Sequence, residues 1–373
     1  MNYEIAAYAP RFRDQVLELQ RHLWGTDRSL NLALFDWKYL QNPFLAEPLI
    51  YLVLAGGKVV GMRGFMGTDW QFGPGEPTYA CPIACDLVID PEHRGRGLFR
   101  HLMGYALSDL AHRGYQYVFN LSANPINYHS SLKTGWRQVM PYRTLRRDTK
   151  RARRVARVRQ SIKRIPYLWR FADNVAASLS RHGFGSFSSI ETYALDDGAL
   201  RIANRPDPAL MAEVAMADMD RGRLRPVSSP RYFAWRLANP VHVYRVLIWE
   251  NPHPLGYVVL QRRRDDPLGA VRLVDFSASC DELTRRMLHL IFNLRGQPEL
   301  TIWSATLGTE VMDVLGRHGF TAIDETRGVA GYTPGVLVRR LGDSFDSEPW
   351  SLGGRNLLDA ANWRLRMVLS DSF

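Results

Sequence analysis

Hydrophobic positions along the chain follow the same order of patterns twice. Each time, an amphipathic segment that ends at Asn-Pro, a helix stop, precedes two short apolar runs joined by a turn, which predicts a strand hairpin. The first segment reads Phe35-Asp36-Trp37-Lys38-Tyr39-Leu40-Gln41-Asn42-Pro43 before strands at 50–54 and 59–65. The second reads Phe233-Ala234-Trp235-Arg236-Leu237-Ala238-Asn239-Pro240 before strands at 244–248 and 255–260.

A later pair of segments matches in the same order. One begins at Leu121-Ser122-Ala123 and ends in Lys133-Thr134-Gly135-Trp136; the other begins at Trp303-Ser304-Ala305 and ends in Arg317-His318-Gly319-Phe320. Ordered agreement at three places favours an internal duplication over coincidence. Strands that alternate with helices indicate the α/β class with crossover connections, so we expect two tandem domains.

These patterns suggest four segments. We expect a first domain at 1–142, a basic amphipathic helical linker at 143–190, a second domain at 191–341 and a C-terminal tail at 342–373, which is a terminal strand or the edge of a pocket.

Composition narrows the class of protein. With 46% hydrophobic and 23% charged residues and three cysteines, the chain is globular and is not a small disulfide scaffold. It has no run of 18 apolar residues, and its first residues lack the pattern of a signal peptide, so a cytoplasmic protein is the expectation.

Positive charge is concentrated in one segment. Residues 143–170 contain ten Arg, two Lys and one acid, which accounts for the whole net charge of +11, so a general nucleic-acid-binding surface is not indicated. A stripe of apolar residues at helical spacing runs through Ala152, Val155, Val158, Ile162 and Ile165. Three interpretations stay open: a solvated helix packed by its stripe, a helix on an anionic membrane surface at the inner membrane face, or a docking site for an acidic partner such as an acyl carrier protein or RNA.

The segment richest in chemistry follows an apolar strand. Asp86-Leu87-Val88-Ile89-Asp90-Pro91 leads into a loop with two glycines and then a helix marked by Leu98, Leu102, Ala106 and Leu110. A helix N-terminus after such a loop binds anions, because its first N–H groups are unpaired and its dipole favours negative charge. Arg94 and Arg96 add cationic donors, and the glycines allow the backbone to approach a pyrophosphate closely.

Here the sequence resembles the GCN5-related N-acetyltransferase (GNAT) superfamily, whose pyrophosphate loop reads Gln/Arg-x-x-Gly-x-Gly/Ala after a strand ending in Val-x-Pro. This chain reads Ile89-Asp90-Pro91 and then Arg94-Gly95-Arg96-Gly97-Leu98-Phe99, with Phe99 in place of the last small residue. The resemblance covers about 1–142 well and 200–340 as architecture. It implies two mixed, mostly antiparallel sheets flanked by helices, and an acyl-CoA donor bound by Leu87 to Ile89, by the loop from Arg94 to Phe99, and by Asn124.

The resemblance also implies an N-acyltransferase in which a primary amine attacks the thioester directly. A backbone N–H among Leu87, Val88 and Ile89 is then the expected oxyanion donor. The tyrosine that often protonates the leaving thiolate in the family is absent, because Ser131 stands four residues before Gly135. Tyr128, His129 or Ser131 is the expected replacement, and Asp86 is a candidate to act as base or to orient the amine.

The second half lacks the loop, since it reads Val274-Asp275-Phe276-Ser277-Ala278-Ser279-Cys280-Asp281 at the equivalent place. We expect a degenerate copy that does not bind coenzyme A and walls one side of the acceptor cleft. Cys81 and Cys85 lack partners with zinc-ligand spacing, so no metal is expected. The leading hypothesis is transfer of an acyl group, most simply acetyl, to a small-molecule amine or amino sugar. The alternatives are an acyltransferase with a carrier-protein or aminoacyl-tRNA donor, and a catalytically silent scaffold that binds a membrane or a partner.

Overall fold

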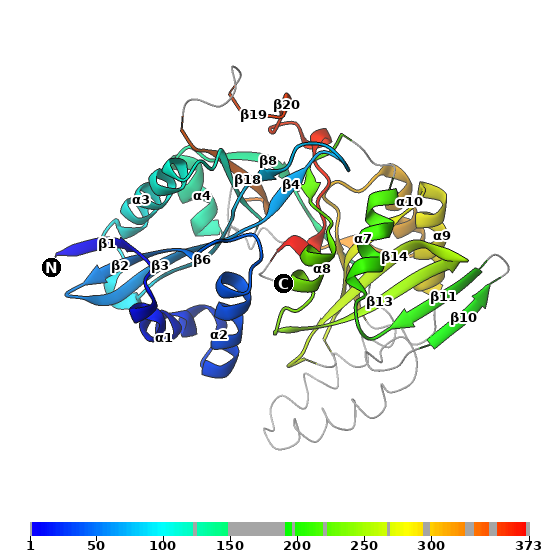
Figure 1. The fold of residues 1–373 in the computed structure, drawn as a ribbon, viewed down its shortest axis with the longest axis horizontal. Coiled ribbons are helices and arrows are strands. Elements are labelled where there is room, and N and C mark those ends of the chain that lie inside the picture. The colour runs from blue at the N-terminus through cyan, green and yellow to red at the C-terminus, as the bar shows by residue number, and fades with distance from the viewer. Residues whose placement is uncertain are drawn as a thin grey trace.

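The computed structural model describes residues 2–121, 125–147, 191–195, 198–218, 222–266, 269–293, 299–324, 332–342 and 349–370. Two central sheets lie side by side, each between two layers of helices (Figure 1). The first residues of the basic helical linker expected at 143–190 form a strand instead, Thr144–Arg147, and residues 148–190 lie outside the described residues. No helix in the described ranges is long and apolar enough to cross a membrane.

The first sheet has seven strands in the order β1-β2-β3-β6-β7-β18-β8. Their bounds are β1 Tyr3–Ala7, β2 Leu49–Ala55, β3 Lys58–Met66, β6 Ile83–Ile89, β7 Tyr117–Asn120, β18 Gly335–Arg340 and β8 Arg137–Pro141. One face carries η1 (Pro10–Phe12), α1 (Arg13–Trp24), α2 (Arg28–Phe35) and η2 (Asp36–Leu40), and the other carries α3 (Leu98–His112) and α4 (Pro125–Lys133).

The second sheet has eight strands in the order β10-β11-β13-β14-β15-β16-β9-β17. Their bounds are β10 Glu191–Leu195, β11 Gly198–Ala203, β13 His242–Asn251, β14 His253–Arg263, β15 Val271–Ala278, β16 Leu300–Trp303, β9 Thr144–Arg147 and β17 Thr321–Ala322. Its faces are covered by α7 (Pro208–Ala217) with α8 (Pro230–Arg236), and by α9 (Asp281–Asn293) with α10 (Thr309–Arg317). The expected pair of mixed, mostly antiparallel sheets flanked by helices is confirmed.

Alternation along the strands explains why each sheet is covered on both faces. In β2, Leu52 and Leu54 join the core on the α1 side, whereas Tyr51 and Val53 join the core under α3. In β13, Val246 and Ile248 belong to the same core as Leu52, whereas Leu247 packs with α9. The inner faces of the two sheets therefore share one continuous hydrophobic core.

The two sheets exchange a strand. Strand β9 follows β8 directly in sequence but pairs with β16 and β17 of the second sheet, while β18 inserts between β7 and β8 of the first. The linear boundaries expected from the sequence do not describe this exchange, because β18 falls within 191–341 and pairs in the first sheet. A strand's sequence shows that it is apolar but not which sheet it joins.

The duplicated Trp motifs meet at the centre of the molecule. The rings of Trp37 and Trp235 stack with their centroids 5.4 Å apart. Each indole Nε1 donates a hydrogen bond of 2.8 Å to the backbone carbonyl of the other tryptophan. The two tryptophans make equivalent contacts with each other, so the two copies of the internal repeat are related by an approximate twofold axis between the domains.

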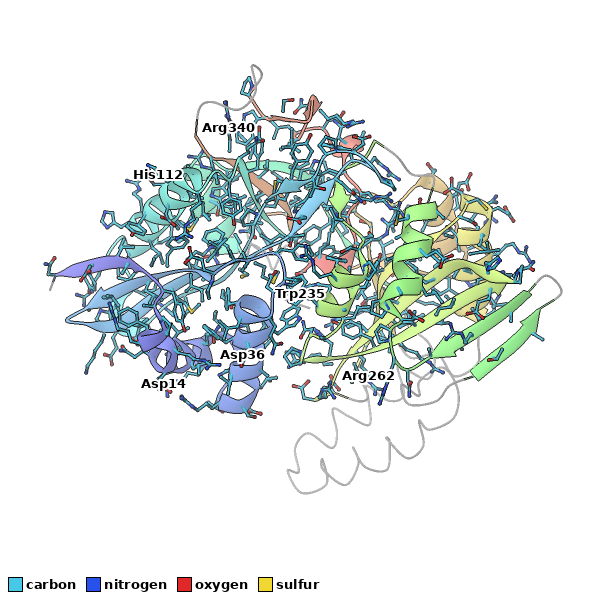
Figure 2. The ribbon with its side chains drawn as sticks, viewed as in Figure 1. Asp14, Asp36, His112, Trp235, Arg262 and Arg340 are labelled. Carbon is cyan, nitrogen blue, oxygen red and sulfur yellow. The ribbon has the colours of Figure 1, made fainter. Side chains whose placement is uncertain are left out.

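The C-terminal tail crosses both domains. A small sheet of β12 (Arg225–Pro226), β4 (Asp69–Gln71) and β5 (Tyr79–Ala80) links them, and the tail adds β19 (Ser351–Leu352), β20 (Arg355–Asn356), η4 (Ala360–Asn362) and η5 (Met367–Leu369). Trp363 packs edge-on against Phe119 of the first domain, and Leu365 exchanges backbone hydrogen bonds with the Thr306 hydroxyl of the second. The view with side chains shows Trp235 between the two halves (Figure 2).

Candidate functional site

The strands β6 and β7 form an opening in the first sheet. They are parallel and pair at Ile83 with Phe119 alone, so the rest of β6 has no register partner on that side. On its other side β6 stays paired with β3, with a bulge at Asp86 between Cys85 and Leu87. A bulge kinks a strand and increases its twist, which moves the end of β6 away from β7.

The bulge leaves backbone donors facing the opening. Asp90 donates its N–H to the Val60 carbonyl of β3. Because successive residues of a strand direct their N–H groups to opposite sides, the N–H groups of Ile89 and Leu87 point toward β7, whereas that of Val88 points toward β3. The half-buried state of Leu87 and Ile89 agrees with an open edge at this position.

Asp86 itself turns away from the opening into the α1 layer. It has a positive φ of 42°, and its buried carboxylate accepts four hydrogen bonds. Lys38 Nζ at 2.7 Å and Trp24 Nε1 at 3.1 Å donate to Oδ1, while the Tyr39 hydroxyl at 2.8 Å and Gln20 Nε2 at 3.3 Å donate to Oδ2. Both side chains of the Lys38–Asp86 ion pair are fully buried, so this cluster fixes the bulge.

Sequence reasoning did not find the partners of Asp86. Lys38 lies in the repeated motif, and a lysine among apolar helix positions is a sequence signal of a buried acidic partner. The opposite residue Gly64 is the second signal, since a Cβ there would overlap the Tyr39 hydroxyl. Burial, followed by the charge of Asp86, raises the pKa of Tyr39 well above its usual value, so the phenol stays a donor to Asp86.

The loop after β6 presents unpaired backbone donors to solvent. After the short helix η3 (Pro91–His93), Gly95 and Gly97 adopt left-handed conformations with φ of 75° and 72°. Gly97 is the N-cap of α3 and supplies no side-chain cap, so the first N–H groups of this helix are not capped by it. Residues Arg94 to Gly97 are all exposed, which keeps this helix N-terminus open.

The side chains of the loop lie around these donors. Arg94 Nε donates to the Ile89 carbonyl at 3.0 Å, and Arg96 reaches the Glu92 carbonyl at 3.4 Å. Leu98 is buried under α3, and Phe99 is half-buried against the same core. Phe99 therefore packs inward, although the family pattern has a small residue there. Farther along α3, a groove of about 400 Å³ is lined by Arg100, Arg339 and Arg340 among others.

The candidate acids lie on α4 or next to it. Tyr128 is buried, donates its hydroxyl to Gln138 at 2.7 Å and contacts the ring of His129. Burial raises the pKa of Tyr128. His129 is half-buried, and Ser131 is buried with its carbonyl accepting from Thr134 and Trp136. Asn124 lies outside the described residues.

The second sheet has a similar opening with different chemistry. Parallel strands β15 and β16 pair at Val271–Leu300 and Arg272–Thr301 and then part. The helix that follows, α9, begins with Asp281 and Glu282, and the preceding Ser279 and Cys280 include no glycine. The N-terminus of α9 therefore carries carboxylates where that of α3 is open to an anion.

All three cysteines are free thiols. Cys81 and Cys85 are buried free thiols, and burial raises the pKa of Cys81. Cys280 is an exposed free thiol. Among the residues that the structure describes, no group of three or more His, Cys, Asp or Glu side chains is arranged to hold a metal ion.

Comparisons with known proteins agree with this geometry. The sequence model of the acetyltransferase (GNAT) domain matches residues 4–139. A search of curated proteins finds no significant match. Among solved structures, a probable N-acyltransferase from Enterococcus faecalis V583 has a TM-score of 0.59 at 10% identity, over 91% of this chain and 72% of that one.

Two further structures have the same fold. A tandem GNAT protein from the clavulanic acid biosynthesis pathway has a TM-score of 0.53 at 11% identity, over 92% of this chain and 100% of that one. Eis1 from Mycobacterium abscessus has a TM-score of 0.51 at 16% identity, over 91% and 74%. Residues 4–139 are therefore a GNAT acetyltransferase domain, and the chain as a whole shares the fold of these tandem structures.

Proposed function

We propose that this protein transfers an acyl group, most simply acetyl, from acyl-CoA to a primary amine of a small molecule such as an amino sugar. The observation that carries the proposal is the open N-terminus of α3, where two left-handed glycines and two arginines follow a strand that has separated from its neighbour. The residues fit a coenzyme A diphosphate, because unpaired N–H groups, a helix dipole and Arg94 and Arg96 converge on one exposed loop.

The opening beside β6 has the donors that the rest of the substrate needs. In this proposal the Leu87 and Ile89 N–H groups bind the extended arm of the donor as an added strand would. One of them stabilises the oxyanion that develops on the thioester carbonyl. The neutral amine adds to the thioester carbon, and the tetrahedral oxyanion collapses with cleavage of the carbon–sulfur bond. The nitrogen releases one proton to solvent, and the leaving thiolate takes up one.

Asp86 acts as a positioning residue in this scheme. Its carboxylate is occupied by four donors, so it holds the bulge and thereby the direction of the Leu87 N–H. Tyr128 and His129 stay the candidates for the proton to sulfur, and Ser131 for holding a water molecule. Burial raises the pKa of the Tyr128 phenol above an ordinary value that already keeps it protonated at neutral pH.

Isothermal titration with acetyl-CoA tests the proposal. Replacing Arg94→Ala together with Gly97→Glu puts a carboxylate where the diphosphate is expected, and should weaken binding about a hundredfold, or about 2.7 kcal/mol. The matched control is Gly57→Glu with Lys58→Ala, another exposed left-handed glycine with open space around it and a neighbouring cation. Equal affinity in both double variants would overturn the placement of the site.

A panel of amines with several acyl-CoA thioesters, read by mass spectrometry, identifies the acceptor and the acyl chain. Formation of an amide on an amino sugar or small amine supports the proposed substrate class. Acylation of carrier proteins or of protein lysines alone would replace it. The alternative donors, an acyl carrier protein or an aminoacyl-tRNA, were suggested by the charge of the basic linker. The main part of that linker lies outside the described residues.

A further inference from the structure

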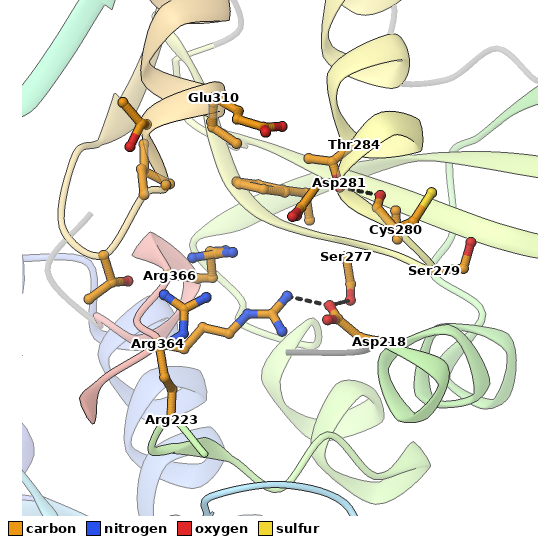
Figure 3. Close-up of a pocket in the computed structure, with 17 residues that line it drawn as sticks. Asp218, Arg223, Ser277, Ser279, Cys280, Asp281, Thr284, Glu310, Arg364 and Arg366 are labelled. Carbon is orange, nitrogen blue, oxygen red and sulfur yellow. Dashed lines mark hydrogen bonds and ion pairs between the residues drawn. The ribbon is translucent and has the colours of Figure 1, made fainter. Parts of the chain in front are cut away.

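The opening in the second sheet contains a cavity of about 520 Å³ (Figure 3). Its lining comes from the end of β15, from the starts of α9 and α10, and from the C-terminal tail. A volume of this size suits a small metabolite. The cavity thus occupies the place that corresponds to the donor cleft of the first domain, without the loop that makes that cleft suitable for a diphosphate.

Positive charge in this cavity comes from a different part of the chain. Arg364 and Arg366 of the tail and Arg223 line one side, and Asp281 and Glu310 lie at the opposite side (Figure 3). The buried Arg364 forms an ion pair with Asp218, which also accepts from the Ser277 hydroxyl. Asp275 is buried beside Arg366, and Glu310 pairs with Arg285 at 3.1 Å.

These contacts leave an excess of positive charge on the tail side. Among the described residues, the guanidinium groups of Arg223, Arg364 and Arg366 line this side together with the carboxylate of Asp218, and the Asp275 carboxylate lies beside Arg366 outside the cavity lining. Burial raises the pKa of Asp275 to about 6, so its negative charge is partly lost just below neutral pH. The tail side of the cavity is therefore cationic.

Arg366 is the side chain placed to meet an anion. Its guanidinium lies 4.2 Å from the centroid of the Phe276 ring, which holds it in the cavity wall. In the described part of the chain its Nε is buried without a hydrogen-bond partner. Burial and then the charge of Arg364 lower the pKa of Arg366 to about 10, so an anion in the cavity would stabilise its charged form.

Backbone donors add to the arginines. The nine-residue helix α10 begins after Gly308, which supplies no side-chain cap, and its first residues Thr309 and Glu310 line the cavity. The preceding Thr306 has a positive φ of 58° and is fixed by its two hydrogen bonds to Leu365 of the tail. Docking of the tail therefore positions both the strained turn and the two tail arginines.

We propose that the cleft of the second domain is a binding site for a small ligand with an oxyanion group, a carboxylate or a phosphate, held by Arg366, Arg223 and the first N–H groups of α10. Coenzyme A is not its ligand, because Asp281 and Glu282 repel a diphosphate at the N-terminus of α9. The site is additional to the donor cleft and separate from it.

Calorimetric titration with sodium phosphate and with sodium succinate, at constant ionic strength, tests the proposal on the full chain. The expected result is saturable binding of at least one anion to the wild type, at least tenfold weaker in Arg366→Gln and in Arg223→Gln. Arg223 is half-buried in a loop, so its variant keeps the test valid if Arg366→Gln does not fold. Binding of phosphate alone assigns a phosphoryl ligand, and binding of succinate a carboxylate.

Two further variants separate this site from others. Arg317→Gln removes the same charge from an exposed position at the end of α10, and Arg94→Gln removes it from the loop of the first domain. Arg317→Gln should bind the anion as the wild type does, and Arg94→Gln should keep the binding that Arg366→Gln loses. No saturable binding, an equal loss in Arg317→Gln, or a loss confined to Arg94→Gln would overturn the proposal, as would coenzyme A binding that Arg366→Gln abolishes.

Discussion

The clefts of the two domains have the same scaffold and opposite chemistry. In both, parallel strands pair briefly and then part, and both of the strands that lead into the cleft helix carry a bulge, at Asp86 in β6 and at Val274 in β15. The first cleft has its arginines in the loop before α3, whereas the second has acids in the first turn of α9 and two arginines from the tail. A duplicated fold therefore keeps its backbone opening while a few side chains at its rim decide what enters.

The two clefts are also held differently. Lys38 and Arg236 occupy equivalent places in the repeated motif, but Lys38 pairs with the buried Asp86, whereas Arg236 donates to the backbone carbonyls of Val368 and Ser370 in the tail. The first cleft thus depends on a buried charge pair and the second on docking of the tail.

The largest expected effect comes from breaking that charge pair. Lys38→Met leaves a buried carboxylate unpaired and should lower the free energy of unfolding by about 3–5 kcal/mol. Arg236→Met leaves only carbonyls unpaired, so its loss should be about 1–3 kcal/mol. Denaturant unfolding measures both, and Lys38→Met with Asp86→Asn should recover much of the loss. Similar losses in the two single variants would contradict the contrast.

The next prediction concerns the number of acetyl-CoA molecules bound per chain. It tests the contrast between the N-termini of α3 and α9. Calorimetry should give one acetyl-CoA per chain. With Arg94→Ala and Gly97→Glu the affinity should fall about a hundredfold, without a second site appearing in the other domain. Two molecules per chain, or one that survives this change, would show that the second cleft also takes the donor.

A smaller effect is expected where the repeats are most alike. Trp37→Phe and Trp235→Phe each remove one indole donor and leave one carbonyl without that bond. Each should cost about 1–2 kcal/mol of unfolding free energy, and the two losses should be equal. The loss of unfolding free energy in the double variant should differ from the sum of the two single losses, because the stacked rings interact. Unequal single losses would mean that the approximate symmetry is geometric only.

The prediction with the smallest effect at neutral pH concerns a buried histidine of the second domain, whose effect on stability grows in acid. His242 on β13 is buried, and burial together with Arg272 lowers its pKa to about 3. The unfolded chain binds this proton more readily, so stability should fall as the pH drops below 6.5, by up to about 1.4 kcal/mol per pH unit. His242→Leu should remove that part of the slope in unfolding measured from pH 7 to 4. An unchanged slope would refute it.

Much of this architecture could be predicted from the sequence, because periodicity and turn residues are local. The repeated Trp37 and Trp235 motifs predicted the duplication, and the loop from Arg94 to Phe99 predicted a GNAT domain; both predictions are confirmed. The donors around Asp86 could not be predicted, since they come from three other places in the chain and meet only through packing. The residue roles assigned to the site remain predictions.

The second cleft was the least predictable region. A degenerate loop is visible in the sequence, but two of the arginines that line the cavity, Arg364 and Arg366, come from the tail, more than 80 residues beyond Cys280. Contacts between distant segments bring them there, among them the hydrogen bonds of Thr306 and Arg236 with the tail and the packing of Trp363 on Phe119. Long-range docking of this kind leaves no periodic signal in the chain.

The exchange of β9 and β18 has a consequence for how the protein is made. Strand β18 lies inside the first sheet, between β7 and β8, yet it is encoded after nearly all of the second domain. During synthesis the first sheet therefore lacks β18 until the second domain has emerged from the ribosome. The apolar edges of β7 and β8 are exposed during that time. Each half completes the other, so a fragment of either would lack an internal strand beside the edge of its own sheet.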